Sequence, residues 1–184
     1  TLFFTSASPS EGKSTVSANT AVTFAQAGKK VLFVDADMRK PTVHYTFRLP
    51  NAAGLSTVLT NQITVEEIVR ETDIDNLSVI TSGPIPPNPS ELLGSKTMTY
   101  LIEKLKEDFD LIVFDAPPTL SVTDAQILSN EMDGTVLVID SGYTEKEAIT
   151  KAKELLDQAD AKILGVVLNN YTNSSGEYYE YYGE

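Results

Sequence analysis

Short apolar runs alternate with longer helical patterns along most of the chain, and this alternation is what most constrains the fold. The runs are nearly continuous in apolar residues, which is typical of strands buried on both faces of a parallel sheet. Strands that alternate with helices form βαβ units, so the sequence predicts an α/β fold with a doubly wound, mostly parallel sheet. The predicted strands span residues 2–6, 31–35, 77–81, 111–115, 135–140 and 163–169.

Helical patterns occupy most of the segments between these runs. The first is rich in Ala and stops before Gly28, a residue type that commonly follows the C-terminus of a helix. In a shorter pattern, Thr64 and Glu67 have the spacing of a capping box. The predicted helices span residues 14–27, 64–70, 95–107 and 145–159, and the proline-rich residues 82–94 predict a loop.

Length and charge narrow the class of protein. The 184 residues are most simply one domain, and we expect residues 1–171 to form it and residues 172–184 to form a flexible tail. A net charge of −12 repels nucleic acid and anionic lipid, so neither is expected as a direct partner. The chain has no Cys, which excludes disulfides and thiol chemistry. No apolar run approaches the roughly 18 residues that a membrane span needs.

The segment ASPSEGKST, which follows the first predicted strand, has the pattern of a phosphate-binding loop. Gly12, Lys13 and Ser14 match the end of that pattern, and Ala7 stands where the first Gly usually lies. Such a loop turns backbone N–H groups inward and opens a helix whose N-terminal dipole favours anions. We therefore expect Lys13 to reach the outer phosphates of a nucleotide and the Ser14 hydroxyl to ligate Mg²⁺.

Aspartates follow two other predicted strands at the edge of the sheet where ligands usually bind. Asp35 and Asp37 end one apolar run, and Asp115 ends another. Together with Ser14 they form a set of oxygen ligands that suits Mg²⁺, whereas the single histidine, His44, argues against a transition-metal site. These motifs predict a Mg-dependent ATPase or kinase and leave open whether water or a hydroxyl group is the acceptor.

The motifs SPSEGKST, VDADMRKPT and FDAPP, taken with a C-terminal tyrosine cluster, resemble the bacterial tyrosine kinases (BY-kinases) of capsule and exopolysaccharide synthesis in Gram-positive bacteria. The resemblance implies a P-loop NTPase fold with deviant Walker motifs, with ATP and Mg²⁺ as cofactors. It implies that Lys13 and Asp115 belong to Walker A and Walker B. It also implies that Asp35 and Asp37 form a second Walker-like motif in which Asp35 acts as the base.

The resemblance extends these roles to further residues. Asn169 looks like the purine contact of related ATPases. The residues expected to bind ATP are Ser10, Glu11, Gly12, Lys13, Ser14, Thr15 and Asn169, and those expected to hold Mg²⁺ are Ser14, Asp35 and Asp115. The expected autophosphorylation sites are Tyr178, Tyr179, Tyr181 and Tyr182.

The resemblance also implies partners. It predicts a homo-oligomeric ring, a membrane-bound activator (a polysaccharide co-polymerase) as a separate chain, a cognate tyrosine phosphatase, and polysaccharide-synthesis enzymes as substrates. The expected location is the cytoplasm, at the inner face of the plasma membrane. Members of the family form the ring through an N-terminal helix, and no such motif precedes Thr1. Either that segment is missing from this chain or the chain assembles differently.

Two other functions remain open at this stage. A partition or division ATPase of the deviant-Walker type carries an extra lysine where this chain has Ser8, and it lacks the tyrosine cluster. A non-catalytic, nucleotide-gated scaffold could dispense with the Lys13 and aspartate set. Arg39 and Lys40, just after the aspartate pair, are candidates to attract the acidic tail, or they are solvated charges or contacts to a neighbouring subunit.

Overall fold

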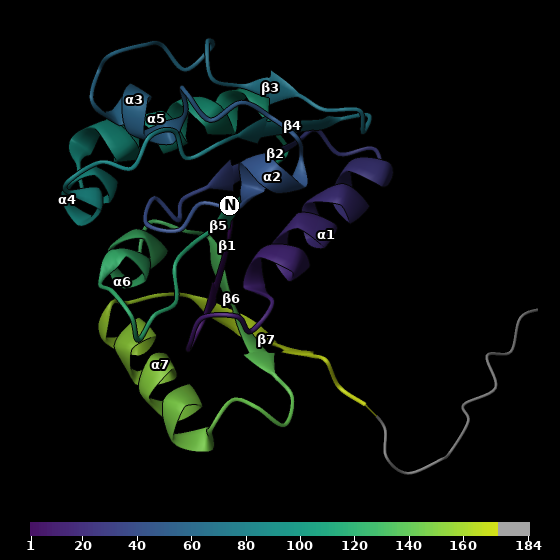
Figure 1. Cartoon of the computed structure of the whole chain (residues 1–184), viewed down its shortest axis with the longest axis vertical. Helices are drawn as coiled ribbons and strands as arrows, with labels where there is room; N and C mark the ends of the chain where they lie inside the picture. The colour runs from purple at the N-terminus through teal and green to yellow at the C-terminus, as the bar shows by residue number, and fades with distance from the viewer. Residues whose placement is uncertain (173–184) are drawn as a thin grey trace, which may run out of the picture.

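The computed structural model describes residues 1–172 and builds them around one seven-stranded sheet (Figure 1). The strand order is β3-β4-β2-β5-β1-β6-β7, and every pair of neighbours is parallel except β3 with β4. The strands are β1 (Leu2–Ser6), β2 (Val31–Asp35), β3 (Arg70–Glu71), β4 (Leu77–Ile80), β5 (Leu111–Asp115), β6 (Gly134–Asp140) and β7 (Ile163–Asn169). The predicted α/β fold with a mostly parallel sheet is confirmed.

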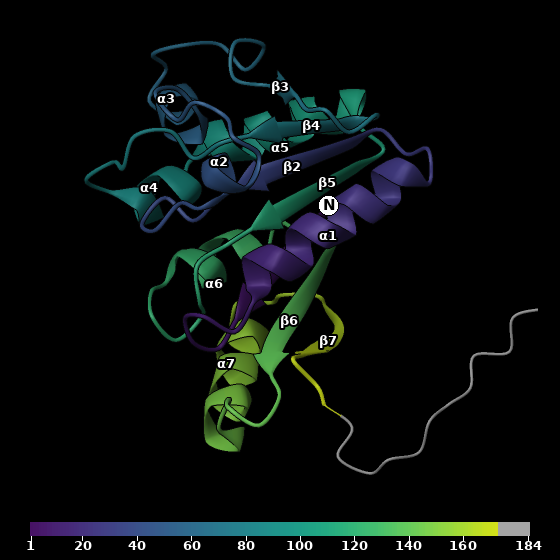
Figure 2. The same ribbon diagram turned by 45° about the vertical axis from the view of Figure 1, so that its right-hand side comes forward.

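Helices cover both faces of the sheet (Figures 1 and 2). Phe33 of β2 packs in the cluster under α1, whereas its neighbours Leu32 and Val34 pack in the cluster under α5, so these two helices lie on opposite faces. Residues of α7 pack against Leu137 and Ile139 of β6. The helices are α1 (Lys13–Gln26), α2 (Val43–Thr46), α3 (Leu55–Leu59), α4 (Pro89–Leu93), α5 (Lys96–Asp108), α6 (Asp124–Ser129) and α7 (Lys146–Gln158).

The first helix owes its close approach to the sheet to small side chains. Ala18, Ala21 and Ala25 recur at the spacing of one helical face and are all buried against β-strand residues. The helix ends at Gln26, and Gly28 follows with a φ of +83°, the left-handed conformation that glycine adopts without strain. This packing fixes the N-terminus of α1 directly beyond the end of β1.

The prediction of a helix over residues 64–70 is wrong. The Thr64 N–H does donate to Glu67 Oε2 at 2.8 Å, as a capping contact should, but the following residues form a single turn. Arg70 instead joins β3, where it pairs antiparallel with Val79 of β4. Because a helix must fix a full turn before it gains further hydrogen bonds, the few residues left cannot sustain one.

The loop prediction for residues 82–94 is wrong in part, because α4 lies inside it. Pro89 occupies the first helical turn, where its missing N–H costs no hydrogen bond. The short helices α2, α3 and α6 and the two-residue strand β3 were also not predicted. All six predicted strands agree with the structure to within one or two residues, and so do the predicted helices at 14–27, 95–107 and 145–159.

The two edges of the sheet differ in character. At one edge β3 is short and polar, whereas at the other β7 presents Leu164, Val166 and Leu168, which are 56%, 55% and 50% exposed. None of the helices in residues 1–172 has the length and apolar character to cross a membrane. The predicted tail from residue 173 onward lies outside the described residues, so the boundary between domain and tail stays a prediction.

Candidate nucleotide and metal site

The loop between β1 and α1 has the backbone conformation that its glycine predicts. Gly12 precedes the helix with a φ of +87°, in the left-handed region. A Cβ atom on Gly12 would collide with the side-chain amide of Asn169, so another residue type here would strain the backbone and displace Asn169. Lys13, Ser14 and Thr15 form the first turn of α1, where unpaired backbone N–H groups and the helix dipole favour a phosphate group.

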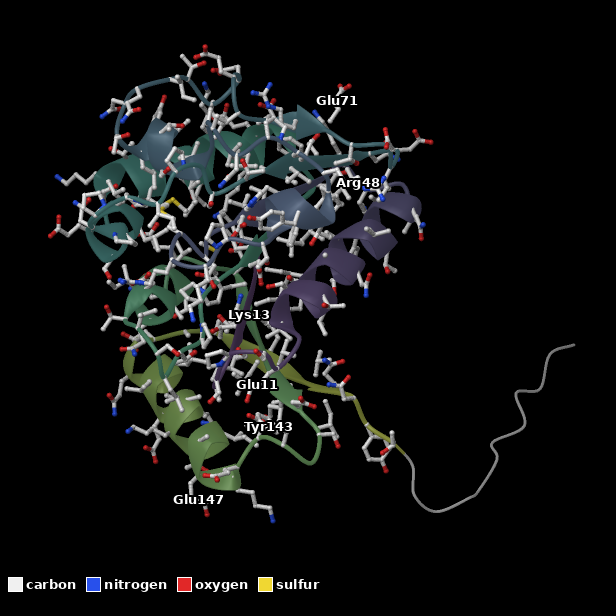
Figure 3. All side chains as sticks on the ribbon, in the orientation of Figure 1. Glu11, Lys13, Arg48, Glu71, Tyr143 and Glu147 are labelled. Carbon is white, nitrogen blue, oxygen red and sulfur yellow. The ribbon has the colours of Figure 1, made fainter. Side chains whose placement is uncertain are left out.

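Glu11 stabilises this loop from inside. Its side chain is fully buried, and its carboxylate accepts hydrogen bonds from the Ser8 N–H at 3.0 Å and the Thr144 hydroxyl at 2.6 Å. The Asn169 amide also donates to the Glu11 backbone oxygen at 3.1 Å. Figure 3 shows Glu11 between Lys13, near the middle of the molecule, and Tyr143, in the loop after β6, with Glu71 at the opposite end. The Glu11 side chain is thus occupied within the protein.

Lys13 lies among the aspartates that end β2 and β5. Its Nζ atom is 3.4 Å from Asp37 Oδ2, 3.4 Å from both carboxylate oxygens of Asp115 and 3.2 Å from Ser14 Oγ. Asp35 and Asp115 are direct neighbours in the register of β2 and β5, and both are fully buried. Three carboxylates and one ammonium therefore share the space beside the phosphate-binding loop.

Burial and this surplus of negative charge together raise the pKa values of two of the carboxylates. Burial, followed by the nearby charge of Asp115, raises the pKa of Asp35 to about 8, although the Val43 N–H that binds its carboxylate at 3.1 Å acts in the opposite direction. Burial also raises the pKa of Asp115, against the attraction of Lys13. A cation placed here would favour the ionised form of both carboxylates.

Hard oxygen ligands with excess negative charge fit Mg²⁺. No three carboxylate or histidine side chains within residues 1–172 are arranged to hold a metal ion by themselves. That arrangement still agrees with Mg²⁺, which commonly takes one or two protein oxygens and completes its shell with water and substrate phosphates. Ser14, Asp37 and Asp115 are the oxygen-bearing side chains within contact of Lys13, and Asp35 lies behind them.

An open cleft of about 470 Å³ lies over these groups. Its lining includes Lys13, Ser14 and Asp37 on one side and Pro118, Ser121 and Val122 from the segment after β5 on the other. Asp35 is fully buried and is not part of the lining; its two carboxylate oxygens accept backbone N–H groups from Asp37 and Val43. A hollow of about 500 Å³ between residues 61–67 and α5 lies elsewhere and contains none of these groups.

Several predicted site residues have contacts that the sequence did not indicate. Arg39 lines the cleft, and its guanidinium group is paired with Asp124, at 2.8 Å from Nε to Oδ2 and 2.9 Å from Nη2 to Oδ1. Lys40 lines the same cleft and is exposed. Neither Asp124 nor Thr144, the partner of Glu11, was predicted, because no local motif marks them. Tyr178, Tyr179, Tyr181 and Tyr182 lie outside the described residues.

Comparison with known proteins matches the fold and the loop. A family model described as an AAA domain (AAA_31) matches residues 10–164. Tyrosine-protein kinase YwqD of Bacillus subtilis is 53% identical over 182 residues, which cover 99% of this chain and 77% of that protein.

Two solved structures are also similar to this one. The kinase domain of the Escherichia coli tyrosine kinase ETK has a TM-score of 0.91 at 34% identity and covers 100% of this chain and 72% of that one. The chimerical protein CapA2B2 has a TM-score of 0.90 at 47% identity and covers 94% of this chain and 76% of that one. The similarity therefore spans nearly all of the chain.

Proposed function

The chain, whose residues 10–164 match the AAA_31 family model, belongs to the family of bacterial tyrosine-protein kinases, and on this premise we propose that it is an ATP-dependent protein-tyrosine autokinase. It transfers the γ-phosphoryl group of ATP to the hydroxyls of Tyr178, Tyr179, Tyr181 and Tyr182 of a neighbouring copy. In this way it regulates the synthesis of capsular or extracellular polysaccharide. The observation that supports this best is the approach of Lys13 to Asp37 and Asp115 beside the phosphate-binding loop.

In this proposal the loop binds and orients the nucleotide. Backbone N–H groups of Ser10, Gly12, Lys13, Ser14 and Thr15 face the phosphates, and Lys13 neutralises charge on the transferred group. Glu11 contributes by holding the loop closed from within, since its carboxylate is occupied by Ser8 and Thr144. When bound through Ser14, Asp35 and Asp115, Mg²⁺ would supply further neutralisation of the phosphate charge.

The tyrosine hydroxyl needs a base, because with a pKa near 10 only about one in a thousand is ionised at pH 7. A positioned carboxylate contributes roughly 10²- to 10⁴-fold. The family resemblance assigns this role to Asp35, but Asp37 is the carboxylate of the pair that lines the cleft. We therefore keep both as candidate bases, and Asp35 would serve only to hold the metal ion if Asp37 contacts the acceptor.

The proposed assembly follows the family resemblance. We infer a homo-oligomeric ring in which the tail of one subunit reaches the cleft of the next, because tethering keeps the acceptor at high effective concentration. A membrane-bound activator recruits the kinase to the inner face of the plasma membrane, a cognate phosphatase reverses the reaction, and enzymes of polysaccharide synthesis are further substrates. Asn169 contacts the purine ring in this proposal.

The test is detection of phosphotyrosine on the full chain after addition of Mg-ATP. We expect labelling of the wild type and none of Lys13→Met, which removes the charge beside the phosphates. Labelling that persists in Lys13→Met would overturn the kinase assignment. Hydrolysis of ATP without any phosphotyrosine would instead favour the partition or division ATPase.

A further inference from the structure

Arg39 occupies a distinctive place beside the candidate site. It lies two residues after Asp37, and the backbone N–H groups of Arg39 and Lys40 both donate to Asp37 Oδ1, at 3.3 and 3.0 Å. The chain therefore turns around the Asp37 carboxylate, and the Arg39 side chain leaves this turn along the wall of the cleft. Arg39 therefore lies in the same cleft as Asp37, one of the two candidate bases.

The Arg39 guanidinium group is held by a buried carboxylate from another part of the fold. Asp124, in the first turn of α6, has no solvent exposure and accepts Nε and Nη2 of Arg39 in a two-pronged pair. Ser90 of α4 donates to Asp124 Oδ1 at 2.6 Å and lies 3.1 Å from Arg39 Nη2. Because a buried carboxylate is costly unless it is paired, Asp124 strongly restrains the orientation of Arg39.

This pairing leaves one edge of the guanidinium group open. Within residues 1–172, Arg39 Nε and Nη2 have side-chain acceptors, whereas Nη1 donates to none of these residues. The Arg39 side chain is 39% exposed, and the exposed Lys40 beside it adds a second cation on the same cleft. The open N–H groups and the neighbouring ammonium are suited to a carboxylate of a bound peptide.

From this geometry we propose that Arg39 is a specificity-determining residue that binds acidic side chains next to the acceptor tyrosine, and that Asp124 and Ser90 are its positioning residues. The inference rests on the proposed tyrosine kinase function. It explains why an acidic chain would carry an acceptor segment in which Glu177 and Glu180 each directly precede a pair of tyrosines. The glutamates would place the neighbouring hydroxyl at the end of the cleft where Asp37 lies.

The test uses two acceptor peptides and the full chain with its four tail tyrosines changed to Phe. One peptide has the sequence of residues 172–184, and in the other both glutamates at positions 177 and 180 are Gln. For Asp124→Asn and Arg39→Ala we expect the KM for the first peptide to rise about tenfold, as loss of a charge-assisted hydrogen bond predicts, with kcat within about twofold. With the Gln peptide, the same variants should change the KM by less than about twofold.

Ser90→Ala provides a milder variant if Asp124→Asn folds poorly, and we expect a smaller rise in KM of about two- to threefold, again only for the glutamate peptide. Glu147→Gln, which neutralises an exposed carboxylate in the first turn of α7, is the matched charge control and should change neither KM. A purely structural role for Asp124 would affect both peptides alike, and that result would overturn the inference. Absence of phosphotyrosine from both peptides and from the unsubstituted full chain, while nucleotide still binds, would overturn the proposed function itself.

Discussion

The side-chain amide of Asn169 donates a hydrogen bond to the backbone oxygen of Glu11, 158 residues earlier in the chain, at 3.1 Å. The contact joins the end of β7 to the middle of the phosphate-binding loop. The end of β7 and the nucleotide loop are thus held together by a hydrogen bond between residues far apart in the sequence. The contact also gives Asn169 a second possible role besides the predicted contact with the purine ring.

Asn169→Ala separates these two roles. If Asn169 mainly holds the loop, affinities for ADP and GDP should fall together, by about three- to tenfold, since one hydrogen bond of about 0.5–1.5 kcal/mol is lost. If it reads the purine, the affinity for ADP should fall while that for GDP changes little. Fluorescence titration with labelled forms of the two nucleotides measures the difference.

Thr144→Val should destabilise the folded chain. It removes the hydroxyl that donates to the buried Glu11 carboxylate at 2.6 Å, and an unsatisfied buried acceptor costs about 1–3 kcal/mol. Thr144→Ser keeps the hydroxyl and is the matched control. Urea denaturation measures the free energy of unfolding, and equal values for the Val and Ser variants would contradict the assigned contact.

Asp35→Asn should change how stability depends on pH in the absence of nucleotide and metal. Because the folded-state pKa of Asp35 is raised from 3.8 to about 8, the folded chain binds one more proton than the unfolded chain between these values. The free energy of unfolding therefore falls as the pH rises through this range. The stability that the folded chain gains from keeping Asp35 protonated is lost above about pH 8. Asparagine cannot ionise, so the variant should lack the part of this decline that Asp35 causes and keep the part that comes from Asp115.

Melting temperatures in EDTA between pH 5 and pH 9 test this prediction. The advantage of Asp35→Asn over the wild type should grow with pH. Asp73→Asn, which changes an exposed aspartate, should follow the wild type at every pH. A wild type and an Asp35→Asn variant with parallel pH profiles would show that Asp35 does not titrate as its burial predicts.

Asp37→Asn tests which carboxylate serves as the base. Asp37 lines the cleft and lies 3.4 Å from Lys13, so its removal should lower the rate of phosphotyrosine formation roughly 10²- to 10⁴-fold if it accepts the proton. Single-turnover measurements with saturating Mg-ATP compare it with Asp35→Asn. A larger loss in the Asp35 variant, at equal nucleotide affinity, would return the base to Asp35.

The parts of the site that follow from the order of the strands could be predicted from the sequence. The carboxyl ends of parallel strands share one edge of the sheet, so Asp35 and Asp115 had to be near the loop that follows β1. Contacts between Arg39 and Asp124, 85 residues apart, and between Glu11 and Thr144, 133 residues apart, depend on how loops pack after the sheet forms. No local pattern encodes them.

Local patterns also failed where a tertiary contact competed with them. Thr64 and Glu67 make the expected capping contact, but strand pairing of Arg70 with Val79 ends the turn before a helix can extend. Pro89 illustrates the converse, since a proline-rich segment that predicts a loop contains a helix that begins at its proline. In the first case the deciding interaction involves a residue outside the segment, whereas in the second it is the local rule that proline is tolerated in the first turn of a helix.

The outer edge of β7 bears on how the purified chain behaves in solution. Among residues 1–172, no strand lies beyond β7, and such a sheet edge is a template for pairing. Leu164, Val166 and Leu168, which are about half exposed, make contact with a second surface favourable. The other edge lacks this property, because its last strand is two charged residues long. Within the described residues, we therefore expect contact between copies of the isolated chain at high concentration to involve the β7 side of the molecule rather than the β3 side.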